Sequence, residues 1–193
     1  GAWQALQRAC TIKRGTLNYA SGDNRMLIDA LIAMPVAATA EVAPIGGKTP
    51  IFIVGMHRSG TTLLEQLLDG SPDVRGVGEL YDFTSAMRYA TDHHCKGVID
   101  RTIIERARDV DFDEIGTRYL DGMAWRLGSE RFFTDKLPSN FLNLGFICRA
   151  LPQARIVHMV RDPVETCFSN LRELFSEANP YSYDQAELAD YFL

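Results

Sequence analysis

Two kinds of hydrophobic pattern alternate along this chain of 193 residues. An unbroken apolar run occurs at 51–54, and a second run at 156–160 is apolar except for His158. Such runs are typical of strands buried on both faces of a parallel sheet. Weaker runs at 74–77 and 131–134 also have the length of strands. Stretches with an apolar residue at every third or fourth position lie between them and indicate helices. The alternation predicts an α/β fold, a doubly wound parallel sheet flanked by helices.

The helical periodicity is clearest in the middle of the chain. One apolar face there is formed by Phe112, Ile115, Tyr119, Met123 and Leu127. Further helices are expected after the first strand, over about 139–150, after residue 162 and over 186–193. Asp162 stands where an N-cap residue should be and Pro163 at the first helical position, which together mark a helix start.

Three segments are expected along the chain. Residues 1–35 form a short N-terminal helical segment, with two helical patterns separated by a turn at Ser21–Asn24. Residues 36–49 are rich in glycine and proline towards their end and are predicted to be a linker. Residues 50–193 are predicted to be one domain. Its last helical pattern has no terminating residue, so we expect the domain to be truncated at its C-terminus.

The composition is that of an ordinary globular protein, with 46% hydrophobic and 23% charged residues. A net charge of −5 argues against binding to nucleic acid or to an anionic membrane surface. No apolar run approaches the length of about 18 residues that a membrane span needs, and the first residues do not have the pattern of a signal peptide. We therefore expect a cytoplasmic protein.

Neither the cysteines nor the histidines have the spacing of metal ligands. The cysteines lie far apart, with no C-x-x-C pair. Adjacent His93 and His94 lack the i, i+4 spacing of helical metal ligands and are expected at the surface. His158 lies in the middle of a predicted strand and is expected in the core. No metal site is predicted.

The segment after the first strand has the spacing of a phosphate-binding loop. Gly55 and Gly60 are separated like the glycines of the nucleotide P-loop G-x-x-x-x-G-K-[ST]. A strand, a glycine loop and a helix present backbone N–H groups and a helix N-terminus to an anion, so the sheet is expected to be of the P-loop type. Thr61 occupies the position of the lysine that a triphosphate site normally uses.

The donors of this loop suit a compact tetrahedral anion. Arg58 is the nearest cation, and its planar guanidinium group can bind two anion oxygens at once. Hydroxyl groups are supplied by Ser59, Thr61 and Thr62. Such a set can hold an anion without a metal ion. The alternative, a strand-to-helix turn that uses its glycines for geometry alone, has less support from this pattern.

A second anion site is predicted at the strand over 156–160. Arg161 follows its carboxyl end, where open α/β sheets bind ligands. Ser169 lies eight residues further, two turns into the next helix, so both side chains can converge on one phosphate. Two alternatives remain open, a surface salt bridge or cap at Arg161 and a Walker B strand with Asp162 on Mg²⁺. Pro163 disfavours the second because it makes Asp162 an N-cap.

Residues 50–80 resemble the 5′-phosphosulfate-binding segment of bacterial tetratricopeptide-linked sulfotransferases and of tyrosylprotein sulfotransferases. Its R-S-G-T-T motif matches Arg58, Ser59, Gly60, Thr61 and Thr62. His57 stands where that family usually has proline.

Residues 154–171 resemble the motif of the same enzymes that binds the 3′-phosphate, with Arg161 and Ser169 at the two binding positions. The resemblance implies a sulfotransferase that uses 3′-phosphoadenosine 5′-phosphosulfate (PAPS), releases adenosine 3′,5′-bisphosphate (PAP) and needs no metal. ATP and GTP have no 3′-phosphate, so a kinase would not need the second site.

The resemblance also implies three catalytic residues. In tyrosylprotein sulfotransferases the base is a glutamate 21 residues after the loop arginine, and Glu79 has that spacing from Arg58. Lys136 lies in a D-K-x-P segment whose lysine offsets the charge on the transferring sulfuryl group. Arg58 is expected to act on the transition state as well as on the bound cofactor.

The implied acceptor is a hydroxyl or amine of a small molecule or a peptide. By position and helicity, residues 1–35 are interpreted as the end of a helical-repeat region, through which a protein partner would bind. Two alternatives remain. A P-loop nucleotide kinase or NTPase is disfavoured by Thr61 and by the pair Arg161–Ser169. A catalytically inactive interaction protein is disfavoured by Glu79 and Lys136.

Overall fold

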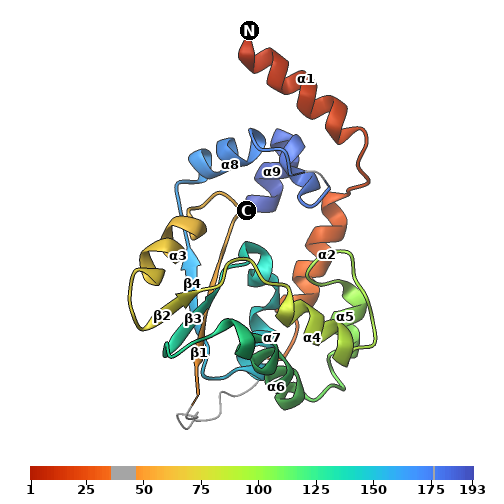
Figure 1. Cartoon of the computed structure of the whole chain (residues 1–193). Coiled ribbons are helices and arrows are strands. Elements are labelled where there is room, and N and C mark those ends of the chain that lie inside the picture. The colour runs from red at the N-terminus through yellow and green to blue at the C-terminus, as the bar shows by residue number, and fades with distance from the viewer. Residues whose placement is uncertain (36–46, 176) are drawn as a thin grey trace.

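The computed structural model of the chain describes residues 1–35, 47–175 and 177–193. Its strands are β1 (Thr49–Gly55), β2 (Val74–Gly76), β3 (Phe132–Asp135) and β4 (Arg155–Met159). They form one sheet in the order β2-β3-β1-β4, and every neighbouring pair is parallel. Helices lie against this sheet (Figure 1). The structure confirms the predicted α/β class.

The helices of the described residues cover the sheet and extend the chain at its N-terminal end (Figure 1). They are α1 (Ala2–Arg14), α2 (Ser21–Ile32), α3 (Thr61–Asp69), α4 (Asp82–Ala90), α5 (Arg101–Arg106), α6 (Phe112–Met123), α7 (Leu144–Ala150), α8 (Pro163–Leu171) and α9 (Gln185–Phe192). Short 3₁₀ helices occupy Ala124–Arg126, Pro138–Asn143 and Pro180–Tyr183. None of the helices described is long and apolar enough to cross a membrane.

An aromatic cluster fills the space between the sheet and the helices α4 and α6. Phe52 of β1 stacks on Tyr119 of α6 with 5.6 Å between ring centroids, and it meets Phe83 of α4 edge-on at 6.1 Å. Phe133 of β3 lies 6.2 Å from Tyr119. All four side chains are almost completely buried. Paired rings of this kind add to the stabilisation from buried area, so the strands that carry the loops are packed on a buried aromatic core.

Strand β4 is less buried than its sequence predicts. It pairs with β1 on one side and lies at the edge of the sheet formed by the described strands. Its residues are exposed or half-buried, because no further described strand covers the outer edge. The prediction of a core position for His158 is therefore wrong, since its side chain is exposed.

The N-terminal helices differ from the prediction at one turn. Ser21–Asn24, expected to separate two helices, instead forms the first turn of α2. Ala20 is the extended N-cap residue, and Asp23 lies in the first turn, where the helix dipole favours an acid. Most of the predicted linker lies outside the described residues, and its last residue, Thr49, already belongs to β1. The helix expected over 139–150 begins as a 3₁₀ helix.

Candidate functional site

The loop between β1 and α3 has a backbone shape that requires its glycines. A Cβ atom on Gly55 would lie 2.5 Å from the carbonyl oxygen of Met159 in β4, so β1 and β4 can approach each other only at a glycine. Gly60 is the N-cap of α3 with a φ of 105°, and Arg58 has a φ of 68°. A left-handed arginine costs on the order of 1–2 kcal/mol, and such strain is concentrated at functional sites.

The loop and the start of α3 offer hydrogen-bond donors to an anion. Ser59 is 4% exposed, and its Oγ has no hydrogen-bond partner among the described residues. A buried polar atom without a partner is rare in proteins and calls for an explanation. No described side chain caps the N-terminus of α3, whose first residues are Thr61, buried, and Thr62, exposed. These groups surround the place where a helix N-terminus binds anions.

The structure brings the two predicted anion sites together. Arg58 Nε donates to Ser169 Oγ of α8 at 3.2 Å. Arg161 Nη1, at the carboxyl end of β4, donates to the backbone oxygen of Arg58 at 3.3 Å. Two motifs separated by about a hundred residues thus come into direct contact at the carboxyl edge of the sheet.

Helix α8 and the segment directly after it present carboxylates to both arginines, which the sequence interpretation missed. Arg161 Nη2 lies 2.8 Å from Glu165 Oε2, and Arg58 Nη1 lies 3.6 Å from Glu173 Oε2. Glu165 and Ser169 are spaced by four residues and therefore share one face of α8. Glu173 lies two residues beyond the end of this helix. All the partners are substantially exposed, and ion pairs of this kind are worth about 0–1 kcal/mol. An anionic ligand can displace them.

A buried asparagine fixes the loop to α8. Asn170 is 0% exposed, and its Nδ2 donates to the backbone oxygen of His57 at 2.7 Å and to that of Thr166 at 2.9 Å. The first bond joins the loop to the helix that carries Ser169. Nothing in the sequence pattern marked Asn170, since a polar residue in the middle of a helix is usually exposed.

Glu79 and Lys136 form a second cluster at the same edge. Lys136 Nζ donates to Glu79 Oε1 at 2.7 Å. The lysine side chain is 7% exposed and the glutamate side chain 51% exposed, so the carboxylate is the more accessible of the two. The backbone N–H of Lys136 also donates to the oxygen of Gly78 at 2.9 Å. Two of the three residues predicted to be catalytic therefore lie in direct contact.

His57 directly precedes Arg58 in the loop. Burial lowers the pKa of its imidazole, while the charge of Glu79 raises this pKa and the charge of Lys136 lowers it. The edge of the ring meets Phe175, with 5.6 Å between centroids. Because its pKa falls below the usual value of 6.5, His57 is expected to be neutral at pH 7.

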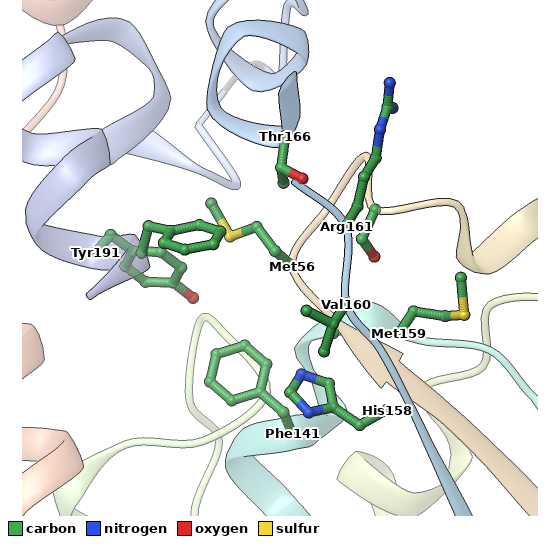
Figure 2. A pocket seen from close by; sticks show the side chains of 11 residues that line it. Met56, Phe141, His158, Met159, Val160, Arg161, Thr166 and Tyr191 are labelled. Atoms are coloured by element: carbon green, nitrogen blue, oxygen red, sulfur yellow. The ribbon is translucent and has the colours of Figure 1, made fainter. Parts of the chain in front are cut away.

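A cavity of about 350 Å³ opens beside the loop. It is lined by Gly55, Met56, Ser59, Phe141, His158, Met159, Val160, Arg161, Thr166, Tyr191 and Phe192. Figure 2 shows that the wall is largely apolar, with the rings of Phe141 and Tyr191, and that the guanidinium group of Arg161 points away from the ring of Phe141. The cavity thus joins an aromatic wall to residues of both anion sites.

A parallel sheet with a glycine loop at its carboxyl edge, and with a second arginine and serine beside that loop, defines an α/β protein with a candidate bipartite anion site. Comparison of the sequence with known families gives a more specific assignment. The sequence pattern described as "Sulfotransferase family" matches residues 50–192. The chain belongs to the sulfotransferase family.

Two curated proteins are similar to the chain over much of its length. An uncharacterized protein of Aquifex aeolicus (strain VF5) is 30% identical over 184 residues, which cover 91% of this chain and 24% of the relative. A putative protein-tyrosine sulfotransferase of Caenorhabditis briggsae is 29% identical over 113 residues, covering 58% of this chain and 39% of the relative. The chain thus spans less than half the length of either relative.

A solved structure is also similar, the crystal structure of sulfotransferase STF9 from Mycobacterium avium. The TM-score is 0.37 at 14% sequence identity, and the match covers 86% of this chain and 64% of that chain.

Proposed function

We propose that the chain carries the donor-binding and reactive site of a PAPS-dependent sulfotransferase that sulfates a hydroxyl or amine of a small molecule or peptide. The observation that carries the proposal is the contact between the two anion sites, in which Arg58 bonds to Ser169 and Arg161 bonds to the Arg58 backbone. A nucleotide with phosphate groups on both its 5′ and 3′ oxygens needs two such sites side by side. Membership of the sulfotransferase family supports this ligand.

The residues present fit PAPS. The buried Ser59 hydroxyl, the N-terminus of α3 and Arg58 would hold the 5′-phosphosulfate, with the hydroxyl groups of Thr61 and Thr62 beside them. Arg161 and Ser169 would hold the 3′-phosphate. The aromatic wall of the adjoining cavity suits a purine ring, since bases bind by stacking on aromatic side chains.

The second cluster supplies the groups that sulfuryl transfer needs. Bound PAPS would provide an activated sulfuryl group. Glu79 is exposed enough to accept the proton of an acceptor hydroxyl. Lys136 would offset the charge that develops on the transferring group and the leaving oxygen. Since Lys136 bonds to Glu79, movement of the ammonium group towards the sulfuryl oxygens would free the carboxylate to act as a base.

Calorimetric titration tests this proposal against the kinase alternative. We expect the complete protein to bind PAP without added metal, and to bind it more tightly than ATP in the presence of Mg²⁺. The physical reason is that Arg161 and Ser169 form a site for a 3′-phosphate, which ATP lacks. A clear preference for ATP with Mg²⁺ would identify the loop as a triphosphate site and overturn the proposal.

A further inference from the structure

Helix α3 buries a glutamate while it exposes leucines. Glu65 is 8% exposed, whereas Leu63 is 62% and Leu67 69% exposed. Moving a carboxylate out of water is unfavourable unless it is paired or hydrogen-bonded. A helix that places an acid where its leucines could lie must therefore hold that acid through specific contacts.

One oxygen atom of Glu65 joins α3 to two other segments. Glu65 Oε1 accepts a hydrogen bond from the backbone N–H of Gly78 at 2.9 Å. The same atom accepts one from Thr134 Oγ1, in β3, at 2.7 Å. The first partner lies in the turn after β2 and the second lies in the neighbouring strand. The carboxylate thus ties the phosphate-loop helix to both strands on that side of the sheet.

Both partners are next to the reactive pair. Gly78 directly precedes Glu79, and Thr134 lies two residues before Lys136. The backbone N–H of Lys136 donates to the oxygen of Gly78 at 2.9 Å, which closes the network. Gly78 has a φ of 80°, a conformation that suits glycine. The backbone positions of both reactive residues are therefore coupled to Glu65.

We propose that Glu65 is a positioning residue that holds Glu79 and Lys136 against each other and at a fixed place relative to the N-terminus of α3. The inference rests on the proposed function. It means that the helix whose first turn binds the sulfuryl donor also sets the position of the base and of the charge-offsetting lysine.

Two substitutions of Glu65 in the complete protein separate positioning from folding. Glu65→Ala removes the acceptor oxygen and should slow single-turnover sulfuryl transfer by at least about tenfold, since a displacement of about 1 Å can cost on the order of 10²-fold. The affinity for PAP should stay within about twofold, because Glu65 is not among the donors of either anion site. Glu65→Gln keeps an Oε1 acceptor and should restore most of the rate. Ile103→Val changes a completely buried side chain of α5 and is the control for an effect of lost stability alone.

A second readout does not depend on activity. Acetylation of lysines, followed by peptide mass spectrometry, should show faster modification of Lys136 in Glu65→Ala than in the wild type or Glu65→Gln. Lys96, whose side chain is 85% exposed, is the internal reference and should react equally in all variants. Slower transfer in Glu65→Ala together with faster acetylation of Lys136 supports the inference.

The possible failures are distinguishable. A Glu65→Ala variant with the wild-type transfer rate and wild-type reactivity of Lys136 overturns the role of Glu65 and leaves the proposed function intact. Equal loss of rate in Glu65→Ala and Glu65→Gln also overturns it, because the acceptor oxygen would then not matter. A wild-type protein that transfers no sulfuryl group overturns the proposed function, while the reactivity of Lys136 still decides whether Glu65 positions that lysine.

Discussion

Replacement of Glu79 with Gln is expected to lower the rate of sulfuryl transfer by roughly 10²–10⁴-fold, the usual contribution of a positioned general base. The affinity for PAP should hardly change, because no phosphate group of the nucleotide is held by a carboxylate. The measurement is single-turnover transfer from PAPS to a working acceptor, with PAP affinity determined in parallel. Gln is nearly isosteric with Glu, so the fold should be retained, and a thermal melt checks this.

Two comparison variants sharpen this result. Lys136→Met should weaken both cofactor binding and transfer, since its charge would face the sulfuryl group in the bound state and in the transition state. Glu114→Gln changes an exposed acid on α6 and should leave both unchanged. If Glu79→Gln transfers at nearly the wild-type rate, Glu79 is not the base, and His57, which directly precedes Arg58 in the loop, becomes the next candidate.

Arg58→Ala is expected to weaken PAP binding by about 1.5–3 kcal/mol, the range for a hydrogen bond to a charged group, which corresponds to roughly 10- to 150-fold in affinity. The transfer rate should fall further than the affinity if Arg58 also stabilises the transition state. Calorimetry and single-turnover kinetics measure the two effects separately. Arg118→Ala is the matched control, because Arg118 is exposed on α6, at the other end of the sheet (Figure 1), and packs over Tyr89.

A second substitution should change the affinity for PAP in the opposite direction through the same arginine. Glu173 lies 3.6 Å from Arg58 and competes with an anionic ligand for it, so Glu173→Gln should tighten PAP binding by a few-fold, an effect of about 1 kcal/mol or less for an exposed pair. Unchanged affinity and turnover in Arg58→Ala would make Arg58 a bystander.

Sequence reasoning located the parts of the fold that local patterns determine. The apolar run 51–54 became β1, and Asp162 caps α8 by accepting a hydrogen bond from the backbone N–H of Glu165 at 2.9 Å, as predicted. The strand and the helix cap both depend on interactions between residues that are close together in the sequence. The sequence could not show that β4 lies at an edge, because strand order depends on which distant strands pair.

The resemblance to sulfotransferases predicts which residues form the candidate site but not which contacts hold those residues in place. Asn170, Glu65 and Glu173 reach the site through contacts with residues far away in the sequence. Each has a polar side chain in or beside a helix, where the usual expectation is exposure. Only the structure shows that the amide of Asn170 and the carboxylate of Glu65 are buried and hydrogen-bonded to these distant segments.

The most direct test of the account is the ratio of the affinities for PAP and AMP, which differ only in the 3′-phosphate. With the complete protein and no added metal, calorimetry should show that PAP binds at least about tenfold more tightly, because charge-assisted hydrogen bonds to that phosphate are worth about 1.5–3 kcal/mol. Arg161→Ala should reduce this preference and leave the affinity for AMP unchanged. Equal affinity of the wild-type protein for PAP and AMP would contradict the account.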